Sequence, residues 1–136
     1  MDVRELRIGN WVYDSRRTQF PMYVTGFSED GYVTLNFPGN EGMDWEADAA
    51  DLEPIRLDAD VRNRLGFVAY GDTRYEKEGE SWTITIHPYF PLIRIESFYE
   101  NSGDLDATFT SEKIKYLHEL QNAFYLTTKQ ELKIEL

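Results

Sequence analysis

Few side chains in this sequence are of the types that carry out acid–base or covalent chemistry. The 136 residues include two histidines and no cysteine, which excludes thiolate metal sites, cysteine nucleophiles and disulfides. His87 precedes Pro88 at the end of a predicted strand, and His118 lies four residues before Asn122 in a predicted helix. A general base needs a reacting proton within hydrogen-bond reach, and nothing local supplies one. We therefore predict no catalytic residue and no enzyme activity, and we keep His118 and Asn122 as candidate binding residues.

The acidic run NEGMDWEADAADLE is the second place where chemistry might be sought. Asp44, Glu46, Asp48 and Asp51 fall within eight positions, but a calcium loop needs a glycine at its sixth position, where this chain has Ala49. The sequence also has no nucleophile elbow, no phosphate-binding glycine loop and no zinc-ligand spacing. We predict no metal and no cofactor, and interpret the run as a solvated loop or an acidic patch that faces a partner.

Aromatic rings beside carboxylates are the remaining candidate for recognition. The chain has 9 Tyr, 8 Phe and 3 Trp, 15% of its residues. Most such rings pack cores, but rings left exposed near acids bind partners. The candidate binding residues of this kind are Trp45, Tyr13, Tyr32, Asp44 and Glu46.

The net charge of −11, from 25 acidic and 14 basic residues, argues against direct binding of DNA or RNA. Its effect on solubility is the simplest interpretation; the alternative is that the acids imitate a phosphate backbone. The start MDVRELRIGN lacks the layout of a signal peptide, and no run has the roughly 18 apolar residues of a membrane span. These features predict a soluble cytoplasmic protein with no membrane association.

The elements that must position these residues indicate an α+β fold. In the predicted hairpin MYVTGFSEDGYVTLNF, Val33, Leu35 and Phe37 alternate with Tyr32, Thr34 and Asn36, as in a half-buried strand. Residues 1–57 are predicted to form a small β-barrel. Residues 58–136 are predicted to form an α+β subdomain with a short helix, antiparallel strands and a C-terminal amphipathic helix; whether the two halves share one core stays open.

Three patterns define the predicted second half. In DADVRNRLGF, Asp58 is the expected N-cap and Gly66 the residue after the helix. SWTITIH alternates with period two and is predicted to pair antiparallel with LIRIESFY through the turn HPYFP. A C-terminal helix is predicted from a cap at Thr110 or Ser111, with Glu112 in its first turn, and its apolar stripe is Ile114, Leu117, Leu120 (or Gln121) and Phe124.

Two resemblances add expectations. LRIGNWVYD followed by YVTGFSEDGYVTLNF resembles the opening of SH3-like barrels of the KOW, Tudor and CarD types. The KOW use of nucleic acid implies a basic face, whereas residues 1–57 carry 5 basic and 11 acidic side chains. The Tudor resemblance implies an aromatic cage for a methylated cation. The candidate rings for this cage are Trp11, Tyr13, Tyr23, Tyr32 and Trp45.

The whole chain resembles a family of uncharacterised proteins of Bacteroidetes genomes and their phages and mobile elements, through LRIGNWVYD, LEPIRL with a helix ending LGF, and IKYLHELQNAFYLTTKQEL. This implies an accessory role. We predict a non-enzymatic module that binds a protein partner; the alternatives are an acidic nucleic-acid mimic that inhibits a host DNA-binding protein, or an enzyme of unrecognised chemistry. Tyr116, Ala123 and Tyr125 widen the apolar stripe of the C-terminal helix, which also allows self-association.

Trp11 and Trp45 have different expected roles. Period-two alternation puts Asn10, Val12 and Asp14 on one face and Trp11 and Tyr13 on the other, so the face of Trp11 is the predicted core face. Trp45, within the acidic run, is the predicted exposed aromatic.

Overall fold

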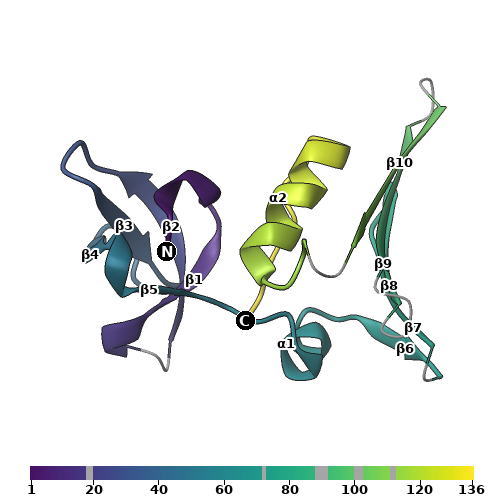
Figure 1. The fold of residues 1–136 in the computed structure, drawn as a ribbon, viewed down its shortest axis with the longest axis horizontal. Helices are drawn as coiled ribbons and strands as arrows, with labels where there is room; N and C mark the ends of the chain where they lie inside the picture. Colours follow the sequence, from purple (N-terminus) through teal and green to yellow (C-terminus); the bar gives the residue numbers. More distant parts are fainter. Residues whose placement is uncertain (18–19, 72, 88–91, 100–102, 111–112) are drawn as a thin grey trace. The chain divides into compact units, whose positions relative to one another are not determined.

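The computed structural model describes residues 1–17, 20–71, 73–87, 92–99, 103–110 and 113–136 (Figure 1). Two compact units make up the chain: Met1–Arg56 with Tyr116–His118, and Leu57–Lys115 with Glu119–Leu136. The α+β prediction is confirmed at this level, because the described chain contains two antiparallel sheets and a C-terminal helix.

The first unit is built on a five-stranded antiparallel sheet in the order β4-β3-β2-β1-β5. The expected hairpin is present: β2 and β3 pair, and Gly31 in the turn has a φ of +85°, which glycine adopts without strain. Short 3-10 turns precede β1 (Val3–Glu5), follow it (Ser15–Arg17) and precede β5 (Ala49–Asp51). The strands are β1 (Trp11–Asp14), β2 (Pro21–Phe27), β3 (Tyr32–Asn36), β4 (Trp45–Asp48) and β5 (Leu52–Pro54).

The core of this sheet follows strand alternation. In β3, Val33 and Leu35 are fully buried while Tyr32 is exposed, as the sequence predicts. A single cluster of buried side chains joins all five strands to the segment before β1; its members are Leu6, Val12, Met22, Val24, Val33, Leu35, Ala47 and Leu52. Among the described residues β4 does not pair with β5, so no closed barrel is found.

The face prediction for β1 is wrong, although Trp11 is buried as expected (6% exposed). Val12 belongs to the core cluster, and Asn10 and Asp14 on the same face are 0% and 1% exposed. Asn10 accepts a hydrogen bond from the Arg7 amide through Oδ1 at 2.7 Å, which closes the turn into the strand. Polar side chains occupy the core face here because backbone groups and ion pairs at the strand ends satisfy them.

The second unit begins with α1 (Ala59–Arg64). Asp58 is its N-cap and accepts a hydrogen bond from the Val61 amide at 2.9 Å, as predicted. Gly66, just beyond the helix, has a φ of +85°, the left-handed conformation that ends many helices.

A five-stranded antiparallel sheet in the order β10-β9-β8-β7-β6 follows. Ile84 pairs with Ile95 and Ile86 with Ile93, which confirms the predicted pairing of β8 with β9; the predicted turn, 88–91, lies outside the described residues. These four isoleucines are buried on one face. The strands are β6 (Val68–Tyr70), β7 (Arg74–Glu78), β8 (Trp82–His87), β9 (Leu92–Tyr99) and β10 (Gly103–Thr110).

Helix α2 (Leu117–Thr128) starts later than predicted. Tyr116 forms a β-bridge with Arg56, and the Leu117 amide donates to the Ile55 carbonyl at 2.8 Å, so this stretch is extended rather than helical. Thr110 belongs to β10 rather than to a helix cap, and the predicted positions 111 and 112 lie outside the described residues. The predicted apolar stripe is buried, and Phe124 meets Trp82 edge-on with ring centroids 4.8 Å apart. No helix in the described part of the chain is long and apolar enough to span a bilayer.

Candidate functional site

Trp45 opens β4 at the rim of the first unit's core. It pairs with Leu35 and shares a face with Ala47, which pairs with Val33. Leu35 and Val33 are fully buried, whereas Trp45 is 38% exposed. The ring therefore lies on the core side of the sheet but at its end, where solvent reaches it.

The rim around Trp45 is a pocket of about 290 Å³ lined by Arg17, Phe20, Met22, Phe37 and Trp45. Met22 is 1% exposed and belongs to the core cluster, so it forms the buried floor. Phe20 is 60% exposed, and Phe37 packs against the core cluster. The pocket is thus an apolar opening that leads from solvent to the core.

A cation already lies on the Trp45 ring. The Arg17 guanidinium carbon is 3.5 Å from the ring centroid, well inside the range of about 6 Å over which a ring face attracts a cation. The neighbouring Arg16 makes the ion pairs with carboxylates instead. The two adjacent arginines therefore have different roles, one as an ion-pair partner and one as a ring cover.

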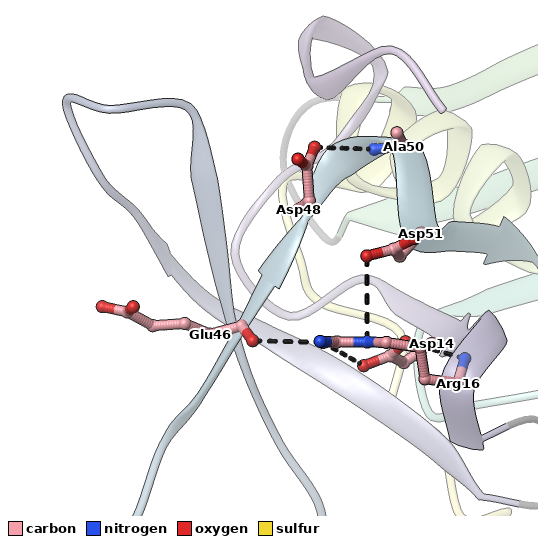
Figure 2. A network of polar contacts seen from close by, with 6 residues as sticks. All are labelled: Asp14, Arg16, Glu46, Asp48, Ala50 and Asp51. Carbon is pink, nitrogen blue, oxygen red and sulfur yellow. Dashed lines mark hydrogen bonds and ion pairs between the residues drawn. The ribbon is translucent and has the colours of Figure 1, made fainter.

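Arg16 fixes the turn that carries Arg17 (Figure 2). Its guanidinium donates to both carboxylate oxygens of Asp14, at 3.1 and 2.9 Å, and to the Glu46 carbonyl at 3.3 Å. The Asp51 carboxylate oxygen Oδ2 lies 3.8 Å from Arg16 Nε. The Arg16 amide also donates to Asp14 at 3.0 Å. These contacts tie the turn after β1 to β4 and to the turn before β5, which holds the backbone next to Arg17 in place.

Asp14 is the most buried carboxylate of this network, with a side chain 1% exposed. The hydrogen bond from the Arg16 side chain lowers its pKa below the ordinary value of 3.8, against the opposing effect of burial. The charged form of Asp14 is therefore the one that the folded unit stabilises.

The candidate acids lie on the opposite face of β4. Glu46 pairs with Thr34 and its carboxylate points away from Arg16 in Figure 2. Asp44 accepts hydrogen bonds from Asn36 at 2.9 Å and from Thr25 at 3.2 Å. Tyr32, which is 44% exposed, lies on the same outer side as Glu46. The structure therefore separates the predicted set: Trp45 faces the pocket, whereas Asp44, Glu46 and Tyr32 share the outer face.

The other candidate residues are not among those that line the pocket. Tyr13 is half-buried and pairs with Pro21 and Glu53. His118 is 2% exposed; its ring stacks on Tyr116 and its Nε2 lies 3.9 Å from Glu5. Asn122 is half-buried one turn further along α2.

Sequence reasoning missed four of the five residues that line the pocket. Arg17 belongs to the polar run SRRTQ, Phe20 follows that run, and Phe37 and Met22 follow the core alternation, so their types do not predict a site. The available signal was a Phe-Pro dipeptide next to a strand, at 20–21 and at 37–38, although the same dipeptide also stands at 90–91. Of the predicted cage rings, Trp11 instead packs edge-on against Tyr23, with centroids 5.3 Å apart.

Chemically, the site offers aromatic faces and an apolar floor rather than acid–base groups. Within the described ranges, no three His, Asp or Glu side chains are placed to hold a metal ion. Comparisons with protein-family models, with curated proteins and with solved structures give no match.

Proposed function

We propose that this chain is a non-enzymatic accessory module that binds a protein partner through the Trp45 pocket. The observation that carries the proposal is an apolar opening on which exposed rings, Phe20 and Trp45, surround a buried core residue, Met22. Exposed apolar surface of this kind marks interaction sites, and large aromatic side chains dominate binding energy at interfaces.

The charge of the first unit indicates which partner fits. Residues 1–57 carry 5 basic and 11 acidic side chains, a net charge of −6, and Asp44 and Glu46 flank Trp45 in the chain. A partner segment that is basic and carries an apolar or cationic side chain for the pocket matches both features, because opposite charge steers association and excludes acidic competitors.

The family resemblance extends the proposal to the setting. We place the protein inside the cells of a Bacteroidetes host, as an accessory product of a phage or mobile element. We also propose an SH3-like arrangement for the first unit, supported by its five short antiparallel strands and the core that they share.

The test is capture from a Bacteroidetes lysate with the wild-type chain, Trp45→Ala and a matched control, Val68→Ala, which removes part of an apolar side chain that is 56% exposed on β6. A protein retained by the wild type and the control but lost with Trp45→Ala is then purified. We expect its affinity to fall about 30-fold with Trp45→Ala. Equal affinity for all three chains, or no protein that distinguishes them, would overturn the proposal.

The alternative, an acidic mimic of nucleic acid, is favoured by the outward carboxylates of β4 and the residue before it, Asp44, Glu46 and Asp48. Salt separates the two proposals, because charge–charge contacts weaken as the screening length shortens. A partner retained at high salt supports the pocket. The mimic is supported by a partner that dissociates steeply as salt rises and that loses more affinity with Glu46→Gln than with Trp45→Ala.

Self-association through α2 is a separate proposal, supported by two neighbouring exposed side chains, Tyr125 at 37% and Leu126 at 67%. Introducing a charge with Leu126→Glu should convert an associated form into a monomer. A concentration-independent molar mass for the wild type in sedimentation equilibrium would contradict it.

A further inference from the structure

The arrangement of two adjacent arginines identifies the chemical group that the pocket accepts. Arg16 takes the carboxylates of Asp14 and Asp51, whereas the Arg17 guanidinium lies on the Trp45 ring at 3.5 Å. Arg17 also lines the same pocket as Phe20, Met22 and Phe37. A guanidinium group therefore already occupies one wall of the opening.

We propose that the Trp45 pocket binds the guanidinium group of a partner arginine, and that Arg17 is the intramolecular occupant that this arginine displaces. The inference rests on the proposed function, because it names the ligand group of the same site. It adds a regulatory element, since Arg17 competes with the partner arginine for the Trp45 ring.

A guanidinium suits this pocket better than an ammonium. It is planar, stacks on aromatic faces and is more weakly hydrated, so less hydration is lost when it enters an apolar site. Phe20, Met22 and Phe37 contribute no side-chain oxygen or nitrogen with which to solvate a compact ammonium ion. The negative charge of the first unit, −6 from 5 basic and 11 acidic residues, favours a cation over a neutral ring.

Only molecules in which Arg17 leaves the Trp45 ring uncovered can bind a partner arginine. The apparent affinity for that arginine is therefore the intrinsic affinity multiplied by the uncovered fraction. A cation–π contact at an exposed site changes an equilibrium about 2- to 5-fold. Removing the Arg17 side chain should therefore raise the affinity for an arginine ligand by this factor. The turn should stay in place, because Arg16 rather than Arg17 makes its ion pairs.

The experiment titrates N-acetyl-arginine amide, and its neutral isostere N-acetyl-citrulline amide, while the Trp45 indole N–H is followed by NMR. The resonance is assigned from its loss in Trp45→Ala. The chains are wild type, Arg17→Ala and Arg4→Ala, which removes the same charge from an exposed arginine paired with Asp2. We expect saturable binding of the arginine probe alone, about 2- to 5-fold tighter in Arg17→Ala and unchanged in Arg4→Ala.

Each other result contradicts part of the inference. Equal binding of the citrulline probe overturns the cation requirement, and equal affinity of wild type and Arg17→Ala overturns displacement. No shift of Trp45 with the arginine probe in either chain overturns the guanidinium site. If a purified partner still depends on Trp45 in that case, the proposed function stands and the ligand group is different. If partner affinity is independent of Trp45, the proposed function fails by itself.

Discussion

The two units bury the apolar face of a five-stranded antiparallel sheet in different ways. In the second unit α2 packs against β8, where Phe124 meets Trp82 edge-on. In the first unit the core cluster comes from the strands themselves and Leu6, and its end opens to solvent beside Trp45. A helix packs against one sheet, whereas the other sheet is closed by side chains of its own strands and has an opening at its end. The candidate site therefore lies where the core of the first unit is incompletely covered.

The largest effect is expected where the helix packs against the second sheet. Phe124 is fully buried, so Phe124→Ala should lower the free energy of unfolding by about 3–5 kcal/mol. The control is Leu126→Ala on the same helix, where a side chain that is 67% exposed should change stability by about 0.5 kcal/mol or less. Urea denaturation measures both, and equal losses would contradict the packing role of α2.

The two tryptophans of the first unit give the next comparison. Trp11 is 6% exposed and packs on Tyr23, so Trp11→Ala should also cost about 3–5 kcal/mol. Trp45 is 38% exposed at the rim, and Trp45→Ala should cost about 1–2 kcal/mol. Equal losses in denaturant unfolding of the two variants would show that the rim is as tightly packed as the core.

The ion pair beside the pocket should make the first unit sensitive to acid. The folded pKa of Asp14 lies below its ordinary value of 3.8, so its contribution is fully present above about pH 5 and is lost as the pH falls through the folded pKa. Asp14→Asn should cost about 1 kcal/mol at pH 7, because Arg16 is half exposed and solvent screens the pair.

The measurement is the free energy of unfolding between pH 7 and pH 3 for wild type and Asp14→Asn. The difference between the two chains should shrink towards the acid end. A constant difference over this range would mean that the charge of Asp14 does not contribute.

The smallest effect is expected at the end of α2. Lys129 has a φ of +60°, the left-handed conformation that glycine adopts at much lower cost. Lys129→Gly should raise the free energy of unfolding by about 0.5–1 kcal/mol. A lower melting temperature in a thermal unfolding experiment would show that the lysine side chain has a packing role that outweighs the backbone strain.

The sequence predicted the elements whose signals are local. Period-two alternation located β3 and β8, and Asp58 and Gly66 marked the ends of α1 because caps act through neighbouring backbone groups. The start of α2 was wrong because the pairing of Tyr116 with Arg56 is a contact between distant segments. Asn10 and Asp14 misled the face prediction for β1, since burial of a polar residue depends on partners that a pattern does not show.

The site was only partly predictable for the same reason. Trp45 was identified from its acidic surroundings, yet those acids lie on the other face of β4. Phe20, Phe37 and Met22 join Trp45 only because the start of β2 lies beside the end of β3 in the antiparallel sheet. Arg17 was not distinguishable from Arg16 in the sequence, and only the position of the Asp14 carboxylate assigns one arginine to the ion pair.

The central claim is that the opening beside Trp45 binds a partner rather than only completing the fold. The most direct test measures the affinity of the purified partner for wild type, Trp45→Ala and Phe20→Ala. Phe20 is 60% exposed, so we expect its removal to leave the fold intact. We expect affinities about 30-fold weaker for Trp45→Ala and at least 5-fold weaker for Phe20→Ala. Affinities equal to that of the wild type in both folded variants would contradict the claim.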